Sequence, residues 1–254
     1  MTLFRSLPPC FWRLTVIYTQ AMQSEIRIGL IGDFNGTHRS HQAIPRALQQ
    51  ASDGIEIVWI PTDTVSAQTL AGFDGLWCVP GMPYKNTDGA MRAIQYARVS
   101  RTPFLGTSAG FQYAILEFAR DVLGLNQAEH SKANPKSAMP LISELGCALA
   151  GAKARVRFLA GSRLQSAYGA SESVEEYHCS HGFNNRYRRL FESNALCIAA
   201  LDDQDEVRAI ELDGHPFFVA TLFQPELRAG DSPLVAAFAA ASAKAHKGIS
   251  KAAS

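Results

Sequence analysis

One pentapeptide, Gly106-Thr107-Ser108-Ala109-Gly110, restricts the fold of this chain more than any other stretch. It follows the apolar run Pro103-Phe104-Leu105 and leads into a helix-like run that begins at about Ala109. The pattern G-x-S-x-G is typical of a strand-to-helix turn so tight that only small residues fit beside the serine. Such an elbow lifts the serine hydroxyl above the sheet edge, where the N–H of Ala109 faces a developing oxyanion. An ordinary helix N-cap is the alternative.

Apolar strand-like runs alternate with helix-like runs around this elbow, which predicts βαβ units and a parallel sheet. Ligands of such sheets collect at the carboxyl ends of the strands. Asp33, Pro80-Gly81 and Ser108 each follow a strand end, so we expect the site there. Pro45 is tolerated only in the first turn of a helix, and a polar loop is expected just before that helix. The expected strands are 26–32, 55–60, 75–79 and the run before Gly106, and the expected helices are 43–48, 88–97 and 109–123.

The second half of the chain is less regular. We expect a loop-rich connection over 124–145, a hairpin turn at Asp213-Gly214 and a closing alanine-rich helix over 233–245. The expected strands are 154–159, 175–180, 196–200, 207–212 and 216–223. The expected domain plan is an N-terminal extension over 1–21 (disordered, or a mis-assigned start), one domain over 22–246 and a frayed tail over 247–254.

Composition narrows the classes of function. The 254 residues carry a formal net charge of +1, which favours neither nucleic acid nor a membrane surface as a partner. No apolar run is long enough to span a bilayer. The cysteines are widely spaced without a zinc-ribbon pattern, so we expect reduced thiols in a cytoplasmic protein that needs no cofactor or metal. They are Cys10, Cys78, Cys147, Cys179 and Cys197.

Four motifs together carry a resemblance to a known family. They are Val79-Pro80-Gly81, the elbow with its continuation Phe111–Arg120, His215-Pro216-Phe217-Phe218-Val219, and Phe223-Gln224-Pro225-Glu226. They resemble class I glutamine amidotransferases, specifically the amidotransferase domain of CTP synthase and the stand-alone bacterial proteins related to it. The resemblance covers roughly 26–240. It implies a flavodoxin-like α/β fold: a mostly parallel sheet flanked by helices, with a smaller antiparallel part in the second half. No P-loop occurs, so no synthase half is expected.

The resemblance also shows what this chain lacks. In the family an elbow cysteine attacks the side-chain amide of glutamine, and an H-P-E motif supplies the histidine base with its orienting glutamate. Here the elbow carries Ser108, the base position carries Gln224, and only Glu226 remains. A neutral amide cannot accept a proton near pH 7, and a serine hydroxyl ionises far less than a thiol. Conventional glutamine hydrolysis is therefore not expected.

The oxyanion and ligand contacts implied by the family are partly kept. Gly81 and Ala109 take the positions of the oxyanion donors, and Met82 follows where the family has a second glycine, which narrows the pocket. Gln112 keeps the family identity and is expected either to contact a bound amide or to pack against the Pro80 loop.

The positions that hold the α-amino acid end of glutamine have changed. By count, Lys132 replaces the glutamate that binds the α-ammonium group, and Ser180 replaces the arginine that grips the α-carboxylate. A lysine repels an ammonium group. The small-molecule ligand is therefore expected to differ from glutamine.

If Ser108 is a nucleophile, it needs a base from elsewhere. The elbow also resembles that of peptidase E and cyanophycinase, which use a Ser-His-Glu triad. The candidate bases are His178 and His181. Strand alternation puts His178 on the face of Ser180, whereas a loop would make His181 equally eligible. Surface or hydrogen-bonded histidines, or a metal cluster with Cys179, are the other interpretations.

His38 and His41 flank Asp33 at the first strand end, where a solvated loop and a role in the site are both open. Three functions follow from these patterns. The first is a hydrolase or acyl-transfer catalyst that acts through Ser108 on a C–N bond of a small amide or amino-acid-like compound. The second is a catalytically degenerate module that binds a small molecule or regulates a partner. The third is glutamine hydrolysis of the CTP synthase type. A homodimer or a partner synthase subunit is a further expectation, and whether the chain is an enzyme stays open.

Overall fold

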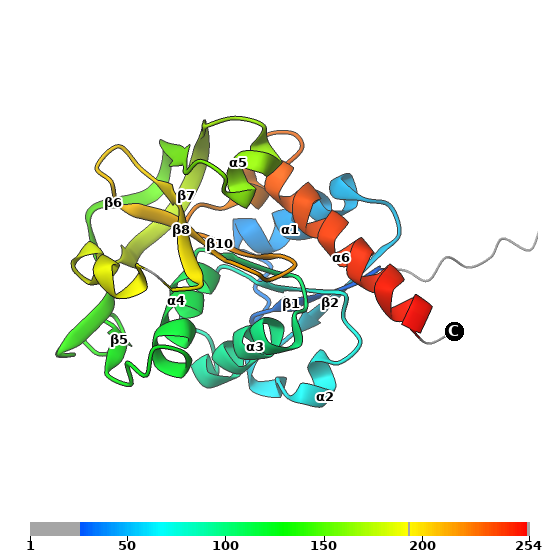
Figure 1. The fold of residues 1–254 in the computed structure, drawn as a ribbon, viewed down its shortest axis with the longest axis horizontal. Coiled ribbons are helices and arrows are strands. Elements are labelled where there is room, and N and C mark those ends of the chain that lie inside the picture. Colours follow the sequence, from blue (N-terminus) through cyan, green and yellow to red (C-terminus); the bar gives the residue numbers. More distant parts are fainter. Residues whose placement is uncertain (1–25, 193, 253–254) are drawn as a thin grey trace, which may run out of the picture.

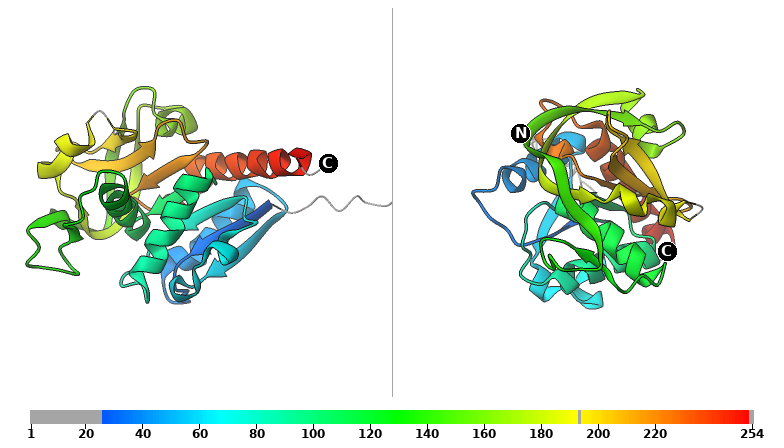
Figure 2. Two further views of the ribbon diagram at one scale, coloured as in Figure 1. Left: turned by 60° about the horizontal axis from the view of Figure 1, so that its bottom comes forward. Right: turned by 90° about the vertical axis from the view of Figure 1, so that its left-hand side faces the viewer.

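The computed structural model describes residues 26–192 and 194–252, so the expected extension over 1–21 lies outside the described residues. The strands form one mixed sheet in the order β2-β1-β3-β4-β10-β9-β8-β6-β5, and β7 pairs with β6 (Figure 1). Figure 2 shows the antiparallel part at one end of the molecule and the end of α6 (Pro233–Ala252) at the other.

The first half forms the parallel part of the sheet, as expected. β1 (Ile26–Ile31) lies between β2 (Ile55–Ile60) and β3 (Gly75–Cys78), and β4 (Phe104–Thr107) pairs with β3. Right-handed helical connections are the usual way to join such strands. The connecting elements are α1 (Arg39–Ala51), η1 (Thr62–Thr64), α2 (Ala67–Leu70), α3 (Thr87–Ser100) and α4 (Ala109–Asp121).

Helices cover both faces of this parallel part. Trp77 of β3 packs edge-on against Phe238, 6.0 Å between ring centroids, so its face of the sheet meets α6. The next residue, Cys78, faces Gly110 of α4, because successive strand side chains point to opposite faces. The buried core therefore lies on both sides of β3 and β4, and it holds the elbow between two packed layers.

The second half extends the same sheet. β10 (Phe218–Thr221) pairs parallel with β4 and antiparallel with β9 (Val207–Leu212), which confirms the hairpin at Asp213-Gly214. The ladder continues antiparallel from β9 to β8 (Leu196–Leu201), to β6 (Met139–Phe158) and to β7 (Glu172–Phe183). The remaining elements are β5 (Ala128–His130), α5 (Arg163–Tyr168), η2 (Asn185–Phe191), η3 (Pro225–Leu227) and α6 (Pro233–Ala252).

Three local expectations were wrong. α1 begins at Arg39, so Pro45 lies inside the helix and the segment 37–41 is partly helical rather than a loop. β5 and β6 occupy part of the expected loop over 124–145. α6 continues past Ala245 to Ala252, where a frayed tail was expected. Register shifts in the β6–β7 ladder, near Glu144 and Ala150, break the alternation that would have revealed a strand.

Candidate functional site

The elbow has the strained geometry that its sequence predicts. Ser108 joins β4 to α4 with φ 52° and ψ −101°, a backbone conformation that side-chain-bearing residues rarely adopt. Its N–H donates to the Thr221 carbonyl oxygen at 2.8 Å. A Cβ on Gly106 would lie 3.0 Å from the Gly110 backbone, and one on Gly110 would collide with the Cys78 carbonyl. Both glycines are therefore required by close backbone packing.

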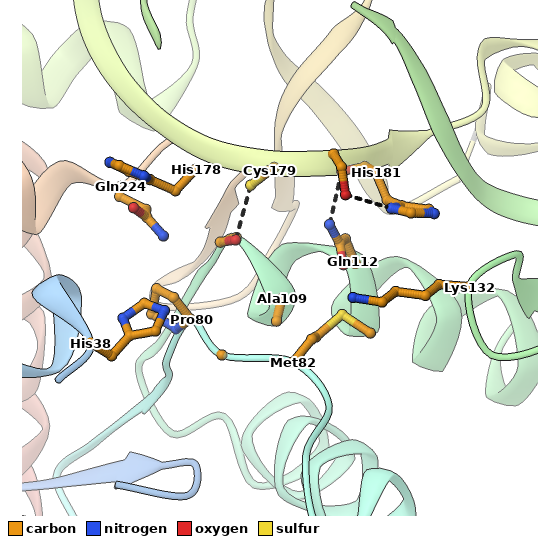
Figure 3. Close-up of a pocket in the computed structure, with 13 residues that line it drawn as sticks. His38, Pro80, Met82, Ala109, Gln112, Lys132, His178, Cys179, His181 and Gln224 are labelled. Carbon is orange, nitrogen blue, oxygen red and sulfur yellow. Dashed lines mark hydrogen bonds between the residues drawn. The ribbon is translucent and has the colours of Figure 1, made fainter. Parts of the chain in front are cut away.

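A cavity of about 190 Å³ opens above the elbow (Figure 3). It lies at the carboxyl ends of β3 and β4, with β7 crossing over it. Most of the residues expected in the site line it, but Glu226 does not. Its lining residues are His38, Pro80, Gly81, Met82, Ser108, Ala109, Gln112, Lys132, His178, Cys179, Ser180, His181 and Gln224.

The hydroxyl of Ser108 contacts a thiol rather than a base. Its Oγ lies 2.9 Å from Cys179 Sγ, whose S–H in turn donates to the Leu222 carbonyl at 3.3 Å. The serine O–H is then the donor to sulfur, since the thiol has a single proton. Burial raises the pKa of Cys179 to about 11, so the thiol is neutral near pH 7. Sequence reasoning considered Cys179 only as a metal ligand and missed this contact.

Neither histidine expected as the base hydrogen-bonds Ser108. His178 Nε2 lies 2.8 Å from Glu176 Oε1 and 3.3 Å from Arg39 Nη1. His181 Nδ1 lies 2.9 Å from Ser180 Oγ. The segment is a strand, as expected, yet four consecutive residues (178–181) all line the cavity. The register shifts opposite this segment explain why simple alternation did not separate them.

The segment 224–226, where the resemblance implies the base and its orienting carboxylate, carries a buried amide and a buried carboxyl. The side chain of Gln224 is buried, and its Oε1 has no hydrogen-bond partner among the described residues. Glu226 faces a second cavity, which it shares with Arg39, Arg46 and Arg228. Burial raises the pKa of the Glu226 carboxyl to about 8, against the weaker opposing effects of its own backbone and of a nearby serine hydroxyl. Neither of its oxygens has a well-formed hydrogen bond within the described part of the chain.

A hydrogen-bonded chain fixes the Gln112 amide in the wall of the cavity. Lys132 N–H donates to His130 Nδ1 at 3.1 Å, which leaves the proton on Nε2 to be donated to Gln112 Oε1, also at 3.1 Å. Gln112 Nε2 then donates to the His181 carbonyl at 2.8 Å. Burial lowers the pKa of His130 to about 4, so its ring is neutral. No spacing signal pointed to His130, because it lies in the segment expected to be a loop.

His41 supports the Pro80-Gly81 loop, which was expected to donate to an oxyanion. Its Nδ1 accepts from the Asn35 N–H at 3.0 Å, so its Nε2 donates to the Pro80 carbonyl at 2.6 Å. Its ring stacks on His38, 4.6 Å between centroids. Gly81 has φ +128°, which favours glycine. Of the two histidines, His38 lines the cavity and His41 lies behind it.

Asp33, which was expected near the site, binds neighbouring loops of the chain. Its carboxylate accepts hydrogen bonds from the Thr62 N–H and hydroxyl and from the Lys85 N–H. Cys78, Cys179 and Cys197 are free thiols. Within the described ranges no three His, Cys, Asp or Glu side chains are placed to hold a metal ion. No helix there has the length and apolar character needed to cross a membrane.

Sequence comparison places the chain among known proteins. The model of the glutamine amidotransferase class-I family matches residues 37–238. The CTP synthase of Caldanaerobacter subterraneus is 31% identical over 235 residues, which is 85% of this chain and 44% of that protein. The CTP synthase of Chloroflexus aurantiacus is 31% identical over 254 residues, 92% of this chain and 46% of that protein. The chain spans about half the length of these relatives.

Solved structures show the same fold. The glutaminase domain of Trypanosoma brucei CTPS with bound acivicin superposes with a TM-score of 0.79 at 22% identity, covering 86% of this chain and 94% of that one. A glutamine amidotransferase of Thermotoga maritima gives a TM-score of 0.54 at 10% identity, covering 88% of this chain and 85% of that one. The expected α/β fold is confirmed by these likenesses.

Proposed function

The chain belongs to the class I glutamine amidotransferase family and is related to CTP synthase, and from this premise we propose that its Ser108 cavity binds a small molecule without hydrolysing glutamine. The carrying observation is the contact of Ser108 Oγ with the neutral Cys179 thiol at 2.9 Å. A nucleophilic hydroxyl needs an acceptor for its proton. A thiol whose pKa is raised does not serve as a general base near pH 7.

The rest of the former catalytic apparatus supports the same proposal. Gln224 has an amide in place of a titratable ring. Glu226 lines another cavity and is protonated near pH 7, since burial raises its pKa to about 8. It therefore neither orients a histidine nor provides a negative charge to stabilise one. The pocket remains, while each step of proton transfer in the family mechanism has lost its group.

The catalytic alternative is a hydrolase that acts through Ser108. It is favoured by the strained elbow, which costs free energy and is typical of nucleophiles, and by the first turn of α4 beneath the cavity. It requires His178 or His181 to move and reach Ser108, because His178 is bonded to Glu176 and His181 to Ser180. A second copy or a synthase subunit as a partner stays a prediction under either proposal.

Labelling distinguishes the two proposals. We expect wild-type protein to release no ammonia from L-glutamine above background and to remain unmodified at Ser108 by a fluorophosphonate or an electrophilic glutamine analogue. Intact mass and peptide mapping separate Ser108 from Cys179. The double variant Ser108→Cys/Gln224→His restores the two family side chains and is expected to gain labelling by the electrophile at residue 108.

The matched control is Ser108→Ala, which keeps the Cβ and removes the hydroxyl. Labelling of wild type at Ser108 that disappears in Ser108→Ala would contradict the proposal and favour the hydrolase. Labelling of Cys179 alone would leave Ser108 without a nucleophilic role and would support it.

A further inference from the structure

The charges around the Ser108 cavity do not suit an amino acid, whose α-ammonium group needs an acidic side chain. No Asp or Glu belongs to the residues that line it, and Lys132 is its one permanently charged side chain among the described residues. Lys132 is exposed, and no salt bridge to it occurs in the described part of the chain. Figure 3 shows its ammonium end directed into the cavity beside Met82.

The two carboxylates that act on histidines of the cavity, Glu176 and Glu144, do not line it and so do not compensate this charge within it. Glu176 is occupied by Arg39 at 2.8 Å and by His178 at 2.8 Å. Glu144 acts on the ring of His181 without lining the cavity. Burial and the charge of Lys132 both lower the pKa of His181. A ligand at this place therefore meets a positive charge with no acidic group in contact.

The middle of the cavity offers hydrogen-bond donors. The N–H of Ala109 opens the 13-residue helix α4, and the first N–H groups of a helix have no acceptor within it. They lie beside the Ser108 hydroxyl and the Gly81 backbone, which line the same space. An acyl oxygen of a ligand fits these donors.

At the end of the cavity away from Lys132, a buried amide oxygen lacks a hydrogen-bond donor within the described part of the chain. Gln224 is only 1% exposed, lines the cavity and leaves its Oε1 without a partner among the described residues. A buried amide oxygen without a partner is costly, and the N–H of a ligand carboxamide is a donor that satisfies it. Figure 3 shows Gln224 and Lys132 on opposite sides of Ala109. The two ends of the cavity thus suit two different groups.

We propose that the cavity binds a small carboxylate that also carries a carboxamide but has no ammonium group. Lys132 binds the carboxylate, the elbow donors bind the amide oxygen, and Gln224 pairs with the amide nitrogen. A volume of about 190 Å³ is small for a ligand pocket and limits the ligand to a short chain. This inference rests on the proposed binding function and names its ligand class.

A matched set of five-carbon probes tests it by calorimetry. Glutaramate, the monoamide of glutaric acid, has the carboxylate and the amide. L-glutamine adds only the α-ammonium group, and glutaramide replaces the carboxylate with a second amide. We expect glutaramate to bind at least about tenfold more tightly than either of the others, since like charges repel and the lysine loses its counter-charge with the diamide.

Substitutions of Lys132 test whether this lysine causes the preference for glutaramate. Lys132→Met is expected to weaken glutaramate binding by about tenfold or more, and Lys132→Glu to reverse the preference in favour of L-glutamine. Lys136→Met is the matched control, because Lys136 is exposed on the same loop and does not line the cavity. Its affinity is expected to equal that of wild type.

The inference is overturned if L-glutamine or glutaramide binds as tightly as glutaramate, if glutaramate shows no binding at about 10 mM, or if Lys132→Met and Lys136→Met behave alike. Ammonia release from bound glutaramate that requires Ser108 is a different result. It would disprove the proposed absence of catalysis while supporting the ligand class, so the two proposals fail separately.

Discussion

The two sides of the Ser108 cavity resemble an amidotransferase site to different degrees. The floor, made by the elbow 106–110 and the Pro80-Gly81 loop, retains the strand-helix geometry of an amidotransferase. The roof, made by residues 178–181 of β7 and by Gln224, places the Cys179 thiol against Ser108 and holds His178 against Glu176. Under the proposed function, the floor keeps donors for an oxyanion beside a roof that supplies no base to Ser108.

Backbone packing constrains the floor more tightly than the roof. A side chain on Gly110 would collide with the carbonyl of Cys78, which belongs to a central strand and cannot move freely. On the roof, Gln224 and Cys179 contribute side-chain atoms, and their replacement alters a local contact without changing a strand. The predictions below test whether the two sides differ in this way.

The largest expected effect concerns the carboxyl behind the roof. Burial raises the pKa of Glu226 from 4.5 to about 8, so between these pH values the folded state binds more protons than the unfolded state. The free energy of unfolding therefore falls as pH rises through this window and levels off above pH 8. Glu226→Gln removes the dependence, and its stability advantage over wild type should grow by on the order of 4 kcal/mol between pH 5 and pH 9.

Urea unfolding at the two pH values measures this difference. Glu192→Gln is the control, since Glu192 is an exposed carboxyl on the same molecule. A wild-type-to-variant difference that is the same at pH 5 and pH 9 would show that Glu226 is ionised in the folded protein. The roof would then keep a charge available to orient a base.

The second-largest expected effect is a loss of stability when a side chain is added to the floor. Gly110→Ala places a Cβ against the carbonyl of Cys78 and is expected to destabilise the fold by about 2–3 kcal/mol. Gly146→Ala is the matched control, because a Cβ on Gly146 meets nothing within 4 Å and should change stability by less than about 0.5 kcal/mol. Equal unfolding midpoints for the two variants would show that the floor tolerates change as the roof does.

The same contrast explains what could be predicted from the sequence. The floor depends on local rules, since small residues at Gly106 and Gly110 specify a tight turn whatever surrounds it. The roof depends on the path of β6 and β7, whose ladder shifts register twice and so lacks a period-two pattern. The contact of Cys179 with Ser108 and the chain from His130 to Gln112 arise only when that ladder folds over the elbow.

The smallest effect concerns the strain stored in the floor. Ser108→Ala and Ser108→Gly both lose the contact with Cys179, so the difference between them isolates the backbone. Glycine relieves the conformation at φ 52° and ψ −101°, and part of this gain is offset by the greater entropy of its unfolded chain. We expect Ser108→Gly to be more stable than Ser108→Ala by about 1 kcal/mol in urea unfolding. If the alanine variant is equally stable, the elbow is relaxed, and its geometry persists through packing at Gly110 alone.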